Sequence, residues 1–115
     1  MKKIEAIIRK TKFEEVKDAL HENGIEFFSF WDARGVGMAR QSRVYRGVAY
    51  DTSTIERIYL SIVVRDINLE RTVKTIVESA NTGEVGDGKI FVSNIDQSVR
   101  IRTGEEGDES LYIKD

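Results

Sequence analysis

The sequence predicts an α+β fold of the ferredoxin-like kind, a double βαβ arrangement with two helices on one face of a four-stranded antiparallel sheet. Two observations lead to this prediction: the pattern of strand, helix and strand occurs twice, and a long aperiodic segment joins the two halves. The 115 residues suffice for one domain with its own core. We assign residues 1–107 to this domain and residues 108–115 to an acidic C-terminal tail.

The first half begins with an isoleucine-rich strand over residues 2–9. Thr11 and Glu14 have the spacing of a capping box, so we expect a helix to begin at Thr11 and to end at Gly24. The second strand is predicted over residues 25–33. Its aromatic side chains are Phe27, Phe28, Phe30 and Trp31. Aromatic residues at this density predict either sheet core or a subunit interface.

The second half repeats the pattern. Alternating apolar residues predict a strand over residues 58–64, and apolar residues at helical spacing predict a helix from Leu69 to Ala80. Asp66 or Asn68 is the expected N-cap of this helix. The remaining strands are predicted over residues 89–94 and 97–102.

Between the halves, residues 35–54 have neither period and form the long loop between the second and third strands. About 20 residues without regular structure are uncommon in a compact domain and are usually functional or disordered. No carboxylate occurs between Asp32 and Asp51, whereas several glycines and arginines do: Gly35, Gly37, Gly47, Arg34, Arg40, Arg43 and Arg46. We predict a protruding loop that docks on a partner or folds over an anion, with a solvated flexible loop as the alternative.

Residues 82–92 contain the strongest functional signal. Glycines at 83, 86 and 88 allow backbone amides to approach an anion closely and to form a nest for phosphate oxygens. Lys89 adds a cation, and Arg100 and Arg102 would project from one face of the predicted strand 97–102. The residues therefore predict a nucleotide- or phosphate-binding loop with an arginine clamp. A glycine-rich connection without a ligand is the alternative.

This loop is not a P-loop. Gly83, Gly88 and Lys89 fit the start of the motif, but Ile90 stands where a Ser or Thr would hold magnesium. A P-loop also follows a strand and opens a helix, whereas this loop follows a helix and opens a strand.

Composition argues against several function classes. With one histidine, no cysteine and no cluster of ligand spacing, neither nucleophilic catalysis nor an intrinsic metal site is predicted. A net charge of −2 argues against general nucleic-acid binding. No apolar run of membrane-spanning length occurs, so a cytoplasmic protein is expected.

Four segments together resemble the PII family of trimeric nitrogen-regulatory signalling proteins. They are MKKIEAIIRKTKFEEVKDALHENGI, YRGVAYD, TGEVGDGKIFV and RIRTGEE, and the resemblance covers residues 1–107. It implies a homotrimer that binds ATP or ADP in the clefts between subunits and is not an enzyme. The family acts on target proteins through residues 35–54, the T-loop.

The resemblance assigns roles residue by residue. The phosphates would meet Gly86, Asp87, Gly88 and Lys89, with Arg100 and Arg102 from across the cleft. The base-side positions would be Ile7, Ser29 and Val63 or Val64, and Gly35 and Gly37 would line the base of the T-loop. Partner-binding positions would be Arg40, Arg43 and Arg46, of which Arg46 matches an arginine that enters the pore of an ammonium transporter. Tyr50 matches a tyrosine that some family members have uridylylated.

One part of the family pattern is altered. Members that sense 2-oxoglutarate read G-x-G-R-Q-x-G, and the glutamine helps to hold magnesium with the ketoacid. Here Arg40 and Gln41 are displaced by two residues, and Arg57 replaces the lysine that pairs with the ketoacid. Magnesium and 2-oxoglutarate are therefore expected as effectors only if Gln41 and Arg57 can take these roles.

Several functions remain open at this point. The resemblance favours a nucleotide sensor that regulates an ammonium transporter or a nitrogen-assimilation enzyme, meeting a membrane only through such a transporter. An adenylate-energy sensor that ignores 2-oxoglutarate and controls another target is the runner-up. A small enzyme acting on a phosphorylated substrate and a purely structural trimer are the remaining alternatives.

Overall fold

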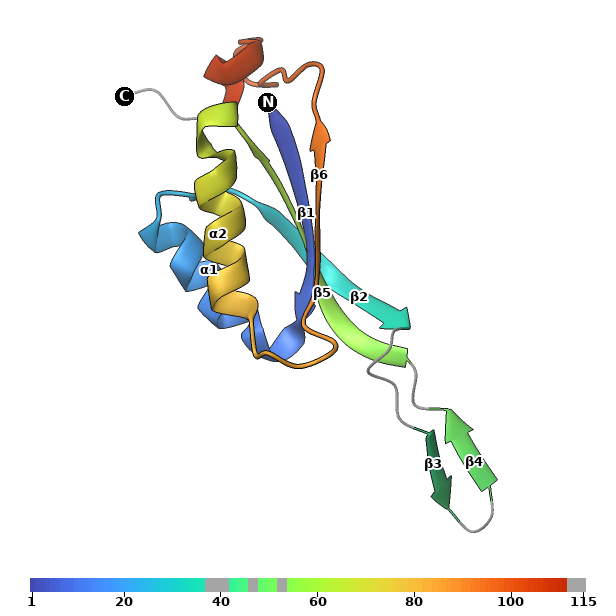
Figure 1. The fold of residues 1–115 in the computed structure, drawn as a ribbon. Coiled ribbons are helices and arrows are strands. Elements are labelled where there is room, and N and C mark those ends of the chain that lie inside the picture. Colours follow the sequence, from blue (N-terminus) through green and yellow to red (C-terminus); the bar gives the residue numbers. More distant parts are fainter. Residues whose placement is uncertain (37–41, 46–47, 52–53, 112–115) are drawn as a thin grey trace.

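The computed structural model describes residues 1–36, 42–45, 48–51 and 54–111 (Figure 1). Its main sheet is antiparallel with the strand order β2-β5-β1-β6. These strands are β1 (Lys2–Arg9), β2 (Ser29–Val36), β5 (Thr54–Val64) and β6 (Gly88–Asn94). The helices α1 (Phe13–Glu22) and α2 (Leu69–Ala80) both cover the same face of the sheet. The predicted fold class is confirmed.

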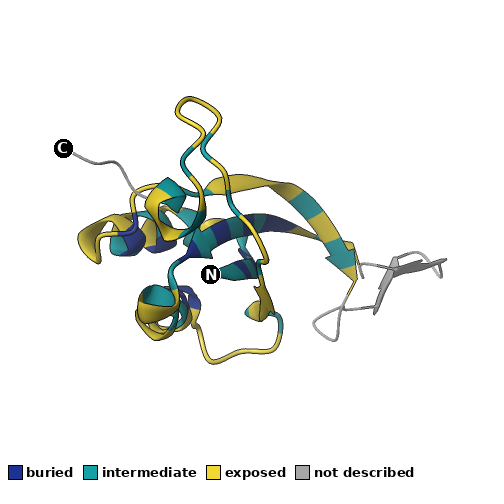
Figure 2. Cartoon of the chain, turned by 90° about the horizontal axis from the view of Figure 1, so that it is seen from above, coloured by how far each residue is buried: buried dark blue, intermediate teal, exposed yellow. Residues whose placement is uncertain are grey.

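The core lies between the central strands and the helices. Alternate residues of β1 and β5 point toward the helices, and those of β5 are Ile58, Leu60, Ile62 and Val64. Val16 and Leu20 of α1 and Ile76 of α2 meet them and are at most 1% exposed. Figure 2 shows the buried residues gathered there, whereas the outer strand β2 is largely exposed.

The helix α1 begins later than predicted, at Phe13, whereas α2 begins at Leu69 as predicted. The turns η1 (Lys10–Lys12) and η2 (Asp66–Asn68) are 3-10 helices that lead directly into α1 and α2. The N-cap of α1 is Lys12, so the capping box at Thr11 was wrong. The N-cap of α2 is Asn68, one of the two predicted residues. Neither N-cap residue forms a side-chain capping bond. The tighter 3-10 turns occupy the positions where side-chain caps were expected. Gly24 follows the C-cap of α1 with φ +81°, as its predicted role requires.

The second strand begins later than predicted. Residues 25–28 leave the sheet because Ile25 turns into the core, where it is 7% exposed, and its N–H donates to the carbonyl of Leu20. The expectation of sheet core is also wrong for Phe27, Phe30 and Trp31, which are 62%, 51% and 47% exposed. Only Phe28 of the four aromatic residues packs against the core.

Part of the segment 35–54 has regular structure. The strands β3 (Ser42–Tyr45) and β4 (Val48–Asp51) pair in an antiparallel hairpin, and β2 and β5 also extend into the predicted loop. The expectation of an aperiodic loop was therefore wrong at these residues. The hairpin lies beyond the ends of β2 and β5 (Figure 1). Predicted site residues 37, 40, 41 and 46, as well as Gly47, lie outside the described residues.

The strand predicted over residues 97–102 is absent from the described chain. A single bridge joins Val99 to Glu106, and a turn occupies residues 101–103. Gly104 closes this turn with φ +74°, and its N–H donates to the carbonyl of Arg100 at 2.7 Å. A 3-10 turn, η3 (Gly107–Leu111), follows. None of the helices in the described ranges is long and apolar enough to cross a membrane.

Candidate functional site

The glycine loop between α2 and β6 is folded around the carboxylate of Asp87. Oδ2 accepts hydrogen bonds from the N–H of Thr82 at 2.8 Å and of Gly83 at 3.0 Å. Oδ1 accepts from the Thr82 hydroxyl and, at 3.0 Å, from Nε of Arg9. The two amides at the start of the predicted nest thus already hold an anion, which is a side chain of the loop itself.

These contacts keep Asp87 ionised. The Thr82 hydroxyl, the Thr82 amide and Arg9 hold the pKa of the Asp87 carboxyl well below its usual range, although partial burial acts in the opposite direction. A carboxylate that accepts several hydrogen bonds is favoured in its charged form.

Two arginines from neighbouring strands tie down the rest of the loop. Arg9 at the end of β1 also donates from Nη2 to the carbonyl of Val85 at 3.0 Å. Arg57 of β5 is paired in register with Arg9, and its Nη2 donates to the carbonyl of Gly86 at 2.9 Å. Sequence reasoning missed Arg9, since only the pairing of β1 with β5 reveals that the two arginines lie together.

The guanidinium of Arg57 is largely enclosed. Its residue is 8% exposed, and Nη1 donates to the carbonyl of Glu56 at 2.9 Å. Burial, followed by the charge of Arg9, lowers the pKa of Arg57 from its ordinary value. The residue expected to pair with a ketoacid therefore has backbone carbonyl partners in this structure.

Gly88 brings the loop against β1. It has φ +110°, and a Cβ there would lie 1.7 Å from the carbonyl oxygen of Ile7. Ile7, Asp87, Gly88 and Lys89 accordingly line one cavity of about 260 Å³, closed on its other side by residues of α2. Three of the four residues expected to meet the phosphates thus lie together with Ile7, one of the expected base-side positions.

The alternatives Val63 and Val64 lie at the opposite end of the sheet, whereas Ser29 lies near its middle, in the same row as Glu5. Val63 and Val64 line a second cavity of about 580 Å³ with Phe27 and Arg65. Val64 is 7% exposed beneath the helices, whereas Val63 lies on the helix-free face, which makes Val63 the more accessible of the two alternatives. Ser29 begins β2, opposite Ser61.

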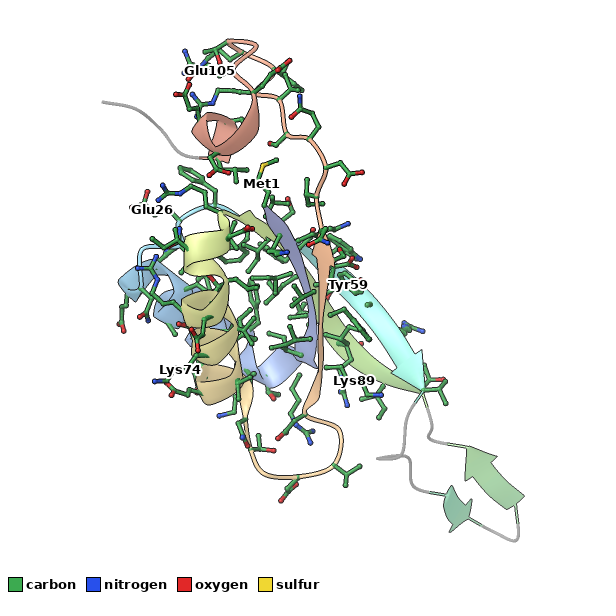
Figure 3. All side chains as sticks on the ribbon, turned by 45° about the horizontal axis from the view of Figure 1, so that its top comes forward. Met1, Glu26, Tyr59, Lys74, Lys89 and Glu105 are labelled. Carbon is green, nitrogen blue, oxygen red and sulfur yellow. The ribbon has the colours of Figure 1, made fainter. Side chains whose placement is uncertain are left out.

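Arg100 and Arg102 also lie beyond that opposite end. The strand between them and the glycine loop, Gly88–Asn94, is 7 residues long and spans about 20 Å. Figure 3 shows Glu105 at the top of the molecule, far from Lys89 in the lower part of the sheet. The arginine clamp therefore does not meet the glycine loop within one chain.

The local surroundings of the two arginines differ from the prediction. Nη1 of Arg100 contacts Oε1 of Glu105 at 3.1 Å, and its Nη2 donates to the carbonyl of Glu109 at 3.0 Å. Arg102 lies exposed in the turn 101–103. Because this segment is a turn, the two residues do not project from one face of a strand.

Comparison of the sequence with known proteins identifies its family. The family model described as "Nitrogen regulatory protein P-II" matches residues 1–105. Nitrogen regulatory protein P-II 1 of Methanothermobacter thermautotrophicus is 48% identical over 112 residues, which is 96% of this chain and 97% of that protein. The chain belongs to the P-II family. The P-II proteins of Azospirillum brasilense and Rhodospirillum rubrum are 43% and 42% identical, each over 96% of this chain and all of the relative.

Membership of the P-II family confirms two expectations. The resemblance inferred from the four sequence segments is correct, and the family's description is that of a regulatory protein in nitrogen metabolism rather than an enzyme. Within the described ranges, no group of three or more acidic, histidine or cysteine side chains is placed to hold a metal ion.

The described part of the P-II T-loop places two more residues. Gly35 lies in β2, paired with Ile55. Arg43 in β3 is directly opposite Tyr50 in β4, so a partner-binding position and the candidate modification site are neighbours in the hairpin.

Proposed function

We propose that this P-II protein is a cytoplasmic adenine-nucleotide sensor. ATP or ADP binds in the clefts of a homotrimer and sets the conformation of the T-loop, which acts on a target such as an ammonium transporter or a nitrogen-assimilation enzyme. A ligand can shift the T-loop only by binding its two conformations with different affinities. Arg57 lies in β5, the strand that follows the T-loop, and its guanidinium donates to the carbonyl of Gly86. This contact offers a physical route for coupling between the glycine loop and the T-loop.

The observation that carries the proposal is the division of the family's nucleotide positions between two ends of one sheet. Gly88 and Lys89 begin β6, whereas Val63 is paired near the other end of the sheet, and Arg100 and Arg102 follow the last residue of β6, Asn94. A contact between one end of a subunit and the opposite end of the next is heterologous, and it closes into a ring when repeated about a threefold axis. Each cleft of such a ring would contain both halves.

The helix-free face of the sheet supports assembly. One row of side chains on this face crosses the four strands and consists of Trp31, Tyr59, Ile7 and Lys89. Phe91 lies in the neighbouring row on the same face. Trp31 stacks on Tyr59 with ring centroids 4.7 Å apart, and Trp31 and Phe91 are 47% and 51% exposed. Apolar surface of this kind is typical of a face that another subunit covers.

A second candidate follows from Arg57. Its guanidinium already donates to the carbonyls of Glu56 and Gly86, and Gln41 is displaced in the sequence. These observations favour an adenylate-energy sensor to which 2-oxoglutarate does not bind and whose target differs from the usual ones. In the first candidate, Arg57 would release Gly86 and pair with the ketoacid beside a magnesium ion that Gln41 helps to hold.

Calorimetric titration tests the proposal and separates the candidates. ATP and ADP are titrated with magnesium, with and without 2-oxoglutarate, into the wild type and into Lys89→Ala. We expect binding to the wild type and at least about tenfold weaker binding to the variant, because a charge-assisted contact is lost. Affinity that rises with 2-oxoglutarate supports the first candidate, and unchanged affinity supports the second. A wild type that binds neither nucleotide would contradict both.

A further inference from the structure

Asp87 occupies an unexpected place in the glycine loop. It belongs to the run of four residues that the family resemblance assigns to phosphate binding, yet its carboxylate points back into the loop. Its oxygens accept hydrogen bonds from the amides of Thr82 and Gly83 and from Nε of Arg9, at nitrogen–oxygen distances of 2.8 to 3.0 Å. An ionised carboxylate in this position is an anion beside the place where an anionic ligand would bind.

The loop is built so that this carboxylate replaces an external anion. Gly83 and Gly86 adopt φ of +84° and +102°, which lets the chain curl around the side chain of Asp87. Arg9 then binds both Asp87 and the carbonyl of Val85, and its side chain is 24% exposed. Without the carboxylate, Arg9 would face Arg57 with no negative charge between them.

We propose that Asp87 is a positioning residue that acts as an internal anion of the glycine loop. It saturates the amides of Thr82 and Gly83, anchors Arg9, and thereby leaves Gly88 and Lys89 as the part of the loop that receives nucleotide phosphates. This inference rests on the proposed nucleotide binding and assigns Asp87 no direct contact with the ligand.

The sign of one mutational effect separates this role from the simplest alternative. If Asp87 were only a negative charge near the phosphates, Asp87→Asn would remove repulsion and bind nucleotide more tightly. If Asp87 positions the loop, the same change replaces one of the two carboxylate oxygens with an NH2 donor. Either the amides of Thr82 and Gly83 or the Thr82 hydroxyl and Arg9 then lose their acceptor, and binding weakens.

The experiment measures ATP and ADP affinity for the wild type, Asp87→Asn and Glu84→Gln by calorimetry. Glu84 is an exposed residue of the same loop, so its neutralisation is a matched change of charge. We expect Asp87→Asn to bind about tenfold more weakly or worse, and Glu84→Gln to bind as the wild type or slightly more tightly. Thr82→Val removes the hydroxyl that donates to Asp87 and accepts from the N–H of Glu84, but it keeps the backbone contacts of the carboxylate. It should weaken binding less, which provides a milder variant if Asp87→Asn fails to fold.

Hydrogen exchange of the ligand-free proteins gives a second test, because it distinguishes a local change in the glycine loop from a change in the stability of the whole protein. The amides of Thr82 and Gly83 should exchange faster in Asp87→Ala, which removes both carboxylate oxygens, and by a larger factor than the amides of the β1–β5 pairs. Equal or tighter nucleotide binding by Asp87→Asn, or exchange at 82 and 83 that rises no more than in the β1–β5 pairs of Asp87→Ala, would overturn the inference while the proposed function stands. Absence of nucleotide binding by the wild type would overturn both.

Discussion

Single residues determine how closely the glycine loop approaches the sheet. Gly88 and Gly83 both have positive φ, but only Gly88 is packed so that a Cβ would meet backbone, 1.7 Å from the carbonyl of Ile7. At Gly83 a Cβ would meet nothing within 4 Å. A side chain at Gly83 would therefore meet only backbone strain, whereas a side chain at Gly88 would meet both strain and a clash with β1.

This difference leads to a prediction for two alanine variants. Gly83→Ala should lower the free energy of unfolding by about 1–2 kcal/mol, the usual cost of a left-handed conformation. Gly88→Ala should cost more, since the added methyl also pushes β6 away from β1. Denaturant unfolding of both variants at one protein concentration measures this. Equal costs would show that β6 adjusts without losing its pairing.

The lowered pKa of Asp87 predicts how stability depends on pH. A group whose pKa is lower in the folded state contributes stability that is present above its unfolded pKa of about 4 and is lost as pH falls toward the folded value. The denaturation midpoints of the wild type and Asp87→Asn should therefore differ most at neutral pH and converge below about pH 4. A difference that persists unchanged at about pH 3 would exclude the Asp87 charge as its source.

At this scale the sequence predicted a binding role for the glycine loop but not the contacts within the loop. Three glycines and Lys89 predict an anion-binding loop from residue type alone. The contact between Arg9 and Asp87 joins residues 78 positions apart, and nothing local indicates it. It follows only from the register of β1 with its two neighbours.

Secondary-structure elements were predicted well where a regular hydrophobic pattern continues over many residues. β5 extends the predicted strand 58–64 to Thr54–Val64, and α2 has the predicted bounds. The errors concern short local structure: the 3-10 turns before both helices, the departure of residues 25–28, and the turn at 101–103. In each, backbone hydrogen bonds or the burial of one side chain override residue preference.

The two faces of β5 should respond differently to truncation. Leu60 is fully buried between sheet and helices, so Leu60→Ala should cost about 2–5 kcal/mol of unfolding free energy. Ser61, the next residue, faces the opposite side, and Ser61→Ala should change stability by only about 0.5 kcal/mol. Denaturant midpoints at a fixed protein concentration provide the comparison. Similar losses would mean that the helix-free face is as tightly packed as the core.

For the molecule as a whole, the exposed aromatic residues of the helix-free face lead to a prediction about assembly. Trp31→Glu places a charge beside Tyr59 on the exposed helix-free face, and we expect a folded monomer on light scattering and circular dichroism. Ile67→Glu is the matched control, because Ile67 is 80% exposed in the turn η2, on the helix side. It should leave the assembly unchanged. An intact oligomer with Trp31→Glu would show that other surfaces hold the subunits together.

The sequence predicted the fold class and the family of the whole molecule because both are encoded in repeated patterns and long motifs. It did not reveal that the glycine loop and the arginines lie at opposite ends of the sheet. Arg100 and Lys89 are only 11 positions apart in the chain, but the extended strand β6 carries them away from each other.

The central claim is that a nucleotide site contains the glycine-loop end of one subunit and the arginine end of the next. Co-refolding Lys89→Ala with Arg102→Ala, followed by ATP titration, tests it most directly. Each variant alone should bind weakly, whereas random mixing should restore intact clefts at roughly one quarter of the sites, because those clefts combine an unmodified end from each variant. A mixture that binds no better than the separate variants would contradict the account.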